Sequence, residues 1–196
     1  GSSGRAGNFA VGWDGGRRML GALDGDATLK AVRDRAILHL AYDLGLRRGE
    51  IAALDLADVD MDGRLLAVLG KGRTQKEKLA LPEVTAMVLA RWIELRGPEL
   101  GPLFVNLDHS KRGRLSGTGI YLMVRDLGQK VGIRARPHGV RHTAITTALD
   151  LTGGDVRMVQ RFSRHRNVRT VMLYDDNRLD LGGQVAEMVA ASAANN

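Results

Sequence analysis

Cysteine is absent from this chain of 196 residues, which excludes disulfides and metal sites built on thiolates. Long apolar runs are missing too, since no stretch approaches the roughly 18 apolar residues that a membrane-spanning helix needs. The first residues, GSSGRAGNFAVGWDGG, lack the apolar segment of a secretory signal. These absences favour a cytoplasmic protein with no membrane partner. Lysine is also scarce and occurs only at Lys30, Lys71, Lys76, Lys78, Lys111 and Lys130, so a lysine within a reactive motif is notable.

Basic charge is in excess. Lysine and arginine total 29 against 22 aspartates and glutamates, which gives a formal net charge of +7. Such a balance favours a polyanionic partner, because each neutralised phosphate releases condensed counterions. The apolar fraction of 44% is ordinary for a globular protein, and the length fits one domain with a short tail.

The apolar pattern predicts a mainly helical α+β protein. Residues 1–27 are rich in glycine and predict a flexible lead-in, with Gly-Ser-Ser-Gly at 1–4 resembling a tag remnant. Apolar spacing predicts helices over residues 29–44, 48–54, 82–95, 120–130, 138–151, 155–162 and 167–174. Two short strands, at 64–69 and 76–81, flank GKGRTQ and predict a small antiparallel sheet. Gly182-Gly183 is expected to break the chain before a short apolar helix over 185–191.

Four separated segments carry reactive side chains. They are LGLRRGEIAAL with Arg47 and Glu50, GKG with Lys71, HGVRH with His138 and Arg141, and SRHRNVRTVMLYDD with His165 and Tyr174. Two arginines can grip one phosphate with planar forks and stabilise the charge that develops at phosphorus. A tyrosine hydroxyl can attack that phosphate if a histidine or a positive site assists it. A lysine can protonate the leaving oxygen, whereas an arginine holds its proton too tightly.

Each group alone has an ordinary structural interpretation. Arg47 and Glu50 form a typical intrahelical ion pair, and a lysine in GKG is usually a solvated turn residue. Tyr174 near a helix end is typical of a half-buried core tyrosine. His138 and His142, four residues apart, have the spacing of metal ligands, but the absence of cysteine and of an evident third ligand argues against a metal. The conjunction of all the groups favours phosphoryl transfer.

The ordered strings LGLRRGEIAALDLADVD, GKG, HGVRHTAITTAL and HRNVRTVMLY closely resemble the motifs of tyrosine recombinases, the phage integrase family. The resemblance runs from about Thr28 to Asp176 and implies that family's catalytic-domain fold. It implies Arg47 and Arg141 as a phosphate clamp, Lys71 as the acid, His138 as the base or proton partner, His165 as a phosphate donor, Tyr174 as the nucleophile and Glu50 as a support.

The resemblance also implies the partners. They are double-stranded DNA at the nucleoid and further copies of the chain, as a tetramer on paired sites that is monomeric without DNA. Neither a metal nor a nucleotide cofactor is implied. Arginines expected to contact DNA are Arg48, Arg73, Arg161, Arg164, Arg166 and Arg169, with Arg157 in the same dense series. The rival hypotheses are a type IB topoisomerase, a telomere resolvase, a DNA-binding regulator that does not cleave, and a metal-dependent nuclease.

The sequence departs from the family pattern in two places. Ser163-Arg164-His165 stands where the family commonly has Leu-Gly-His. The family's amino-terminal helical domain has no counterpart in residues 1–27, which favours a fragment of a longer enzyme over a naturally short one. The predicted organisation is a lead-in over 1–27, a catalytic domain over 28–180, and a tail helix over 181–196 that packs on a neighbouring subunit.

Overall fold

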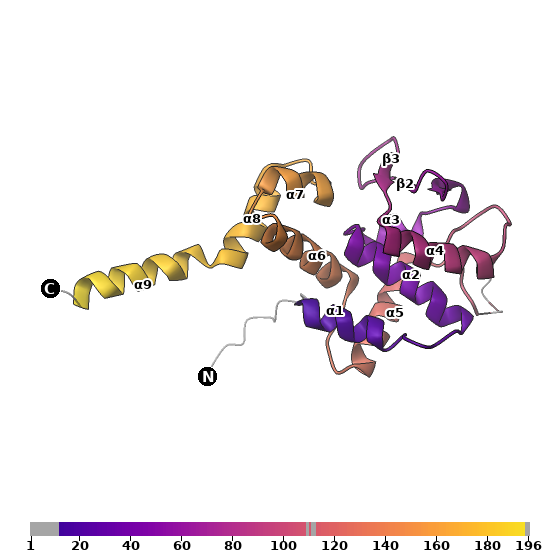
Figure 1. Cartoon of the computed structure of the whole chain (residues 1–196), viewed down its shortest axis with the longest axis horizontal. Coiled ribbons are helices and arrows are strands. Elements are labelled where there is room, and N and C mark those ends of the chain that lie inside the picture. The colour runs from indigo at the N-terminus through magenta and orange to yellow at the C-terminus, as the bar shows by residue number, and fades with distance from the viewer. Residues whose placement is uncertain (1–11, 109, 111–112, 195–196) are drawn as a thin grey trace. The chain divides into compact units, whose positions relative to one another are not determined.

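The computed structural model describes residues 12–108, 110 and 113–194 (Figure 1). The chain divides into two compact units, Gly1–Ala144 and Ile145–Asn196, here called unit 1 and unit 2. The boundary falls within helix α6 (Pro137–Leu151). No helix among the described residues is long and apolar enough to span a membrane.

Helix α1 (Gly12–Gly21) corrects the prediction of a flexible lead-in. Met19 and Leu23 are buried in the core of unit 1, so the segment after residue 12 is part of the folded unit. Gly16 explains part of the glycine content, because a Cβ there would lie 2.7 Å from the Tyr42 hydroxyl. Glycine therefore serves close helix packing here. The predicted tag remnant at 1–4 and the rest of 1–11 lie outside the described residues.

The core of unit 1 forms around helix α2 (Leu29–Asp43), which packs against helix α4 (Glu83–Arg96). Thr28 caps α2 by accepting a hydrogen bond from the Ala31 N–H, which satisfies an otherwise unpaired donor. Trp92 of α4 is fully buried and stacks on Phe104 with ring centroids 6.2 Å apart. Burial of these large side chains is the main stabilising contribution to this unit.

A three-stranded antiparallel sheet in the order β1-β2-β3 completes the middle of unit 1. A short 3₁₀ helix, η1 (Leu56–Asp58), leads into β1 (Val59–Asp60), which sequence analysis did not predict. Strands β2 (Leu65–Val68) and β3 (Glu77–Ala80) form the predicted hairpin, with Leu66 paired to Leu79. Leu66 and Val68 are buried and alternate with more exposed neighbours, as expected for a strand with one face on the core.

Helix α3 (Arg48–Ala52) and helix α5 (Gly117–Lys130) contact each other in unit 1. Ser116 caps α5, and its hydroxyl accepts a hydrogen bond from the Gly119 N–H at 3.0 Å. The contact brings the start of α3 next to the face of α5 that carries Tyr121, because the Arg48 guanidinium lies 5.4 Å from the Tyr121 ring centroid.

Unit 2 contains the end of α6 and helices α7 (Val156–Ser163), α8 (Val168–Leu179) and α9 (Leu181–Ala194). Asp155 and Asn167 cap α7 and α8 through their side chains, as the sequence predicts. The core of this unit consists of Ile145, Leu149, Val159 and Val171. The predicted break at Gly182-Gly183 is wrong, since both glycines lie inside α9 and the interruption falls at Asp180, with φ of 47°.

Candidate active site

Arg47 immediately precedes α3 in unit 1, and Glu50 holds it there. The Arg47 backbone N–H donates to Glu50 Oε1 at 2.8 Å, and its guanidinium lies 3.5 Å from Glu50 Oε2. The Glu50 carboxylate is buried while the Arg47 side chain is 29% exposed. One carboxylate thus caps the helix and orients the guanidinium, which keeps part of its surface available to a ligand.

Lys71 lies in a tight turn between β2 and β3, and the GKG motif follows from the geometry of that turn. The Arg73 N–H donates to the Gly70 carbonyl at 3.0 Å, and Gly72 has φ of 71°, a conformation that glycine adopts without strain. A Cβ at Gly70 would lie 3.2 Å from the Arg73 side chain and 3.7 Å from Glu50 Oε2. The turn therefore approaches the carboxylate that orients Arg47, and it presents Lys71 to solvent.

An ion pair anchors the strand that leaves this turn. Lys76, just before β3, places its Nζ 2.5 Å from Oδ1 of Asp58 in η1. The Asp58 side chain is 8% exposed, and its other oxygen accepts the Asp55 N–H at 2.8 Å. Because the Asp58 carboxylate is held on both sides, it is a fixed point for the hairpin that carries Lys71.

Helix α6 contributes Arg141 and His138 within unit 1. Arg141 is buried, and its Nη1 donates to the Gly45 carbonyl at 2.5 Å, in the loop just before Arg47. His138 is exposed one turn earlier on α6. Burial lowers the pKa of His142, with a smaller contribution from His138, which favours the neutral form of His142.

His165 and Tyr174 lie side by side in unit 2. Their ring centroids are 6.0 Å apart, and His165 Nδ1 is 2.8 Å from the hydroxyl of the buried Ser163. The Tyr174 ring packs against the small core of unit 2 and is half-buried. Arg178 reinforces α8, because its guanidinium bonds Asp175 at 2.6 Å and Asp150 at 2.7 Å. The structure therefore places His165, predicted as a phosphate donor, beside Tyr174, predicted as the nucleophile.

The predicted DNA-contacting arginines are distributed over both units. Arg48 and Arg73 are exposed in unit 1, at the start of α3 and at the end of the Lys71 turn. In unit 2, Arg161, Arg166 and Arg169 are exposed, while Arg164 is half-buried. Arg164 ends α7 in the left-handed conformation, with φ of 60°, at the position where the resembled family pattern has glycine.

Groups of three or more His, Asp or Glu side chains that could hold a metal ion do not occur among residues 12–108, 110 and 113–194. The structure also reveals two features that sequence reasoning missed. One is the Asp58–Lys76 ion pair. The other is a basic groove lined in part by Arg125, Arg134 and Arg136. The sequence Arg134-Ala135-Arg136, directly before the HGVRH motif, was the available signal for the groove.

The fold and these side chains define the class as the catalytic domain of a tyrosine recombinase. The sequence profile of the phage integrase family matches residues 17–179, and the chain belongs to that family. A tyrosine recombinase of Synechocystis sp. is 41% identical over 168 residues, which cover 83% of this chain and 54% of the relative. One of Synechococcus elongatus is 40% identical over 181 residues, which cover 88% and 56%. The chain thus spans about half the length of these relatives.

Solved structures agree with the fold. The crystal structure of XerA recombinase is 30% identical with a TM-score of 0.70, over 86% of this chain and 61% of that one. XerH recombinase bound to its difH substrate is 20% identical with a TM-score of 0.70, over 89% of this chain and 52% of that one. The second likeness concerns the fold alone.

Proposed function

We propose that the chain is the catalytic part of a site-specific recombinase that cuts and rejoins DNA through a 3′-phosphotyrosine at Tyr174. The observation that carries the proposal is the pairing of Tyr174 with His165 in a member of this family. Unit 1 of the same chain holds Arg47, Arg141 and Lys71 on adjoining segments.

The proposed reaction begins when the Tyr174 oxygen attacks a backbone phosphorus. The bond to the 5′ oxygen breaks, Lys71 protonates that oxygen, and the tyrosine proton passes to His138. Arg47, Arg141 and His165 stabilise the negative charge on the phosphoryl oxygens. A 5′ hydroxyl of the partner strand then attacks the phosphotyrosine and reverses the step on a new junction, so bond energy is conserved without a nucleotide cofactor.

Glu50 supports this chemistry without contacting the substrate. Its buried carboxylate bonds the Arg47 backbone and lies beside the Lys71 turn, so it couples the positions of two groups with different tasks. Preorganised cations cost little reorganisation when charge develops, which is how such sites accelerate phosphoryl transfer.

Double-stranded DNA is the proposed substrate, and the net charge of +7 supports it. The solved XerH structure that resembles this chain is a complex with its DNA substrate. Such a substrate would keep the protein at the nucleoid. Exposed arginines of both units, among them Arg48, Arg73, Arg161, Arg166 and Arg169, are proposed to contact phosphates, and half-buried Arg164 borders that set.

Substitution of Tyr174 by Phe tests the proposal. The change removes one oxygen and preserves the ring, so packing against the small core of unit 2 is retained. The substrate is a nicked duplex carrying the target site, from which the cleaved fragment diffuses away and traps the phosphotyrosine. On a denaturing gel the parent should give a shifted covalent band, and Tyr174→Phe should bind DNA but give none. A band that persists in Tyr174→Phe would show that another residue attacks.

Two related activities are separated by the products. Strand exchange between two duplexes identifies a recombinase, whereas relaxation of supercoils identifies a type IB topoisomerase and hairpin ends identify a telomere resolvase. A parent that binds its site and never forms the covalent band would be a DNA-binding regulator. A metal-dependent nuclease would lose its activity in chelator.

Helix α9 is proposed to pack on a neighbouring subunit when four copies assemble on paired sites. Leu181, Val185, Met188 and Val189 are between 45% and 68% exposed, so their apolar surface lacks cover within the described chain. Deletion of the residues after Gly183 should leave DNA binding intact and weaken assembly on paired sites, measured by gel filtration with DNA. Loss of all DNA binding would instead assign the helix to its own subunit.

A further inference from the structure

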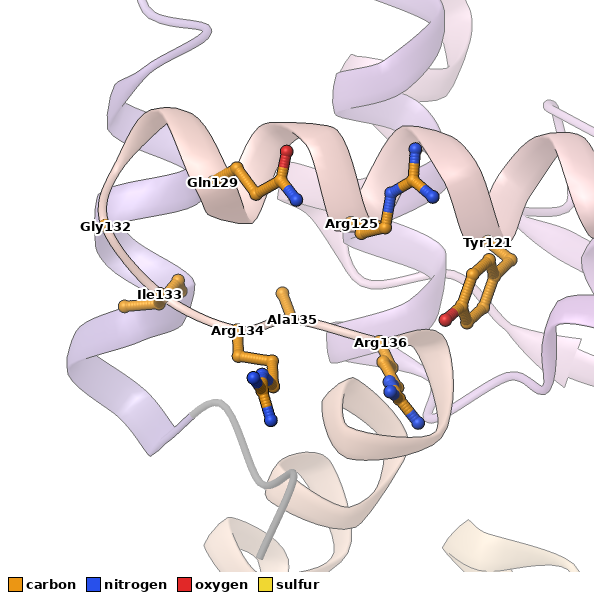
Figure 2. A pocket seen from close by; sticks show the side chains of 8 residues that line it. All are labelled: Tyr121, Arg125, Gln129, Gly132, Ile133, Arg134, Ala135 and Arg136. Atoms are coloured by element: carbon orange, nitrogen blue, oxygen red, sulfur yellow. The ribbon is translucent and has the colours of Figure 1, made fainter. Parts of the chain in front are cut away.

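A groove in unit 1 joins α5 to the segment that leads into α6. It has a volume of about 520 Å³ and is lined by Tyr121, Arg125, Gln129 and residues 132–136 (Figure 2). Three of the lining residues are arginines, and none carries a carboxylate. Positively charged side chains that share a groove without a negative one repel one another, and a bound anion relieves this repulsion.

Two glycines build this groove. Gly132 has φ of 75° and ends α5 in a Schellman arrangement, in which the Ile133 N–H donates to the Gly128 carbonyl at 2.9 Å. A Cβ at Gly128 would lie 2.6 Å from the Ala135 side chain, so only glycine lets the returning segment approach α5. Arg18 of α1 donates to the Val131 carbonyl and secures the turn. The groove is therefore a shaped feature of the fold.

The arginines of the groove differ in whether a nearby carboxylate of the protein already balances their charge. Arg125 lies 2.9 Å from Asp126, but both side chains are about half exposed, and such a pair contributes little in water. Arg134 is exposed and has no ion-pair partner among the described residues. Tyr121, Arg125 and Gln129 follow at four-residue spacing on one face of α5, so the groove offers donors along its length.

One end of the groove, opposite the Gly132 turn, adjoins two segments that carry candidate catalytic groups (Figure 2). At this end Tyr121 is covered by Arg48, the residue after Arg47. Arg136 lies at the same end and directly precedes α6, and Arg141 follows five residues later, about 7.5 Å further along at roughly 1.5 Å per residue. Phosphates of one DNA strand are spaced about 3.4 Å apart along the duplex axis. A strand held at Arg141 would thus place a phosphate about two nucleotides away at the groove.

We infer that this groove is a second, non-catalytic site for the DNA backbone, in which Arg125, Arg134 and Arg136 hold phosphates beside the one to be cleaved. The inference rests on the proposed function, because it takes DNA as the substrate. Contacts of this kind fix the position of the duplex and carry no base specificity.

The test is the salt dependence of binding of the full chain to a short duplex. Arg125→Gln/Arg134→Gln removes two charges from the groove, while Arg35→Gln/Arg91→Gln removes two arginines of α2 and α4 that pair with Asp24 and Glu94. Each phosphate contact contributes about 0.9 to the slope of log K against log salt. The slope of the groove variant should therefore be smaller by about 1 to 2, and that of the control should match the parent.

Two results would overturn the inference while the proposed function stands. One is an unchanged slope in a groove variant that still forms the covalent Tyr174 complex. The other is an equal decrease in the control, which would assign the effect to net charge. Titration with inorganic phosphate, followed by NMR of the arginine side chains, adds a further check. Loss of phosphate binding in the groove variant with an unchanged DNA slope would mark a small-anion site and overturn the assignment to DNA. A parent that binds no duplex at any salt concentration would instead contradict the proposed function itself.

Discussion

The two units differ in how their candidate catalytic groups are held. Unit 1 carries Arg47, Lys71 and Arg141 on segments that are built on a large core, which includes fully buried Trp92 and Phe104. Unit 2 supports Tyr174 with a core of four fully buried aliphatic residues and with the ion pairs of Arg178. Regions with few buried apolar contacts open at lower free energy, and moving functional elements are drawn from them. The comparison indicates that the proposed phosphate-binding groups are more firmly held within unit 1 than the proposed nucleophile is within unit 2.

The largest expected effect concerns Lys71, the proposed acid in unit 1. Lys71→Arg keeps the positive charge but holds its proton much more tightly than lysine does, so loss of general acid catalysis should slow cleavage by about 10²- to 10⁴-fold. A substrate with a sulfur at the 5′-bridging position has a leaving group that needs little protonation, and it should restore much of the rate. Equal slowing on both substrates would mean that Lys71 only positions or neutralises the phosphate.

Removal of Arg47, a proposed phosphate-clamp arginine, should have a somewhat smaller effect on the cleavage rate. Arg47→Ala deletes one donor to the developing charge, which by analogy with an oxyanion donor should cost on the order of 10² to 10³ in cleavage rate. Sulfur substitution should not restore this loss, since the leaving group is unaffected. Arg35→Ala on α2, whose partner is Asp24, is the matched control and should cleave as the parent does. If the sulfur substrate restored the cleavage rate of Arg47→Ala, the separate roles proposed for Arg47 and Lys71 would be contradicted.

Loss of the Lys76–Asp58 ion pair, which anchors the hairpin, should slow cleavage in the same way as Lys71→Arg but by less. Lys76→Ala frees β3 from Asp58 and should slow cleavage about 10-fold, less than the 10²-fold that a displacement of about 1 Å can cost. The sulfur substrate should restore the cleavage rate of Lys76→Ala, and Lys76→Arg should cleave the ordinary substrate at the parent's rate. In a double variant, Lys76→Ala should cause no further loss beyond that of Lys71→Ala. Lys78→Ala removes the same charge from the exposed side of β3 and serves as control. If the rate losses of the two single variants added in the double variant, Lys76 would act independently of Lys71.

The smallest effect tests the strain in unit 2. Arg164 has φ of 60°, and a left-handed residue with a side chain costs about 1–2 kcal/mol, while glycine loses about 0.4–1 kcal/mol more chain entropy on folding. Arg164→Gly should therefore raise the free energy of unfolding by about 0.5–1 kcal/mol, measured by urea denaturation. Arg166→Gly, a neighbouring exposed position without positive φ, is expected to lower stability. Destabilisation by Arg164→Gly would show that contacts of the arginine side chain outweigh the backbone strain.

Periodic segments were predicted well, and glycine-rich segments were not. The apolar spacing of α2 and α6 and the capping residues of α7 and α8 are local signals, so the corresponding predictions agree with the structure. The glycine content predicts a flexible lead-in that includes residues 12–27 and a chain break at Gly182-Gly183, because glycine has low helix propensity. Packing against Tyr42 accounts for Gly16 in α1, and the structure continues α9 through the glycine pair. In α1, tertiary contacts override the low helix propensity of glycine, about 1 kcal/mol per residue.

The order and spacing of reactive residues by themselves determined the family and the list of candidate catalytic groups, because six chemical functions in one order are specific when taken together. Only the tertiary structure decided which groups adjoin, since Glu50 meets the Lys71 turn and Arg141 reaches the loop before Arg47 across long stretches of chain. It also decided that Lys76 finds its partner in Asp58 and that Arg125 shares a groove with Arg134. Such pairings depend on how helices and strands pack, and no local pattern in the sequence records them.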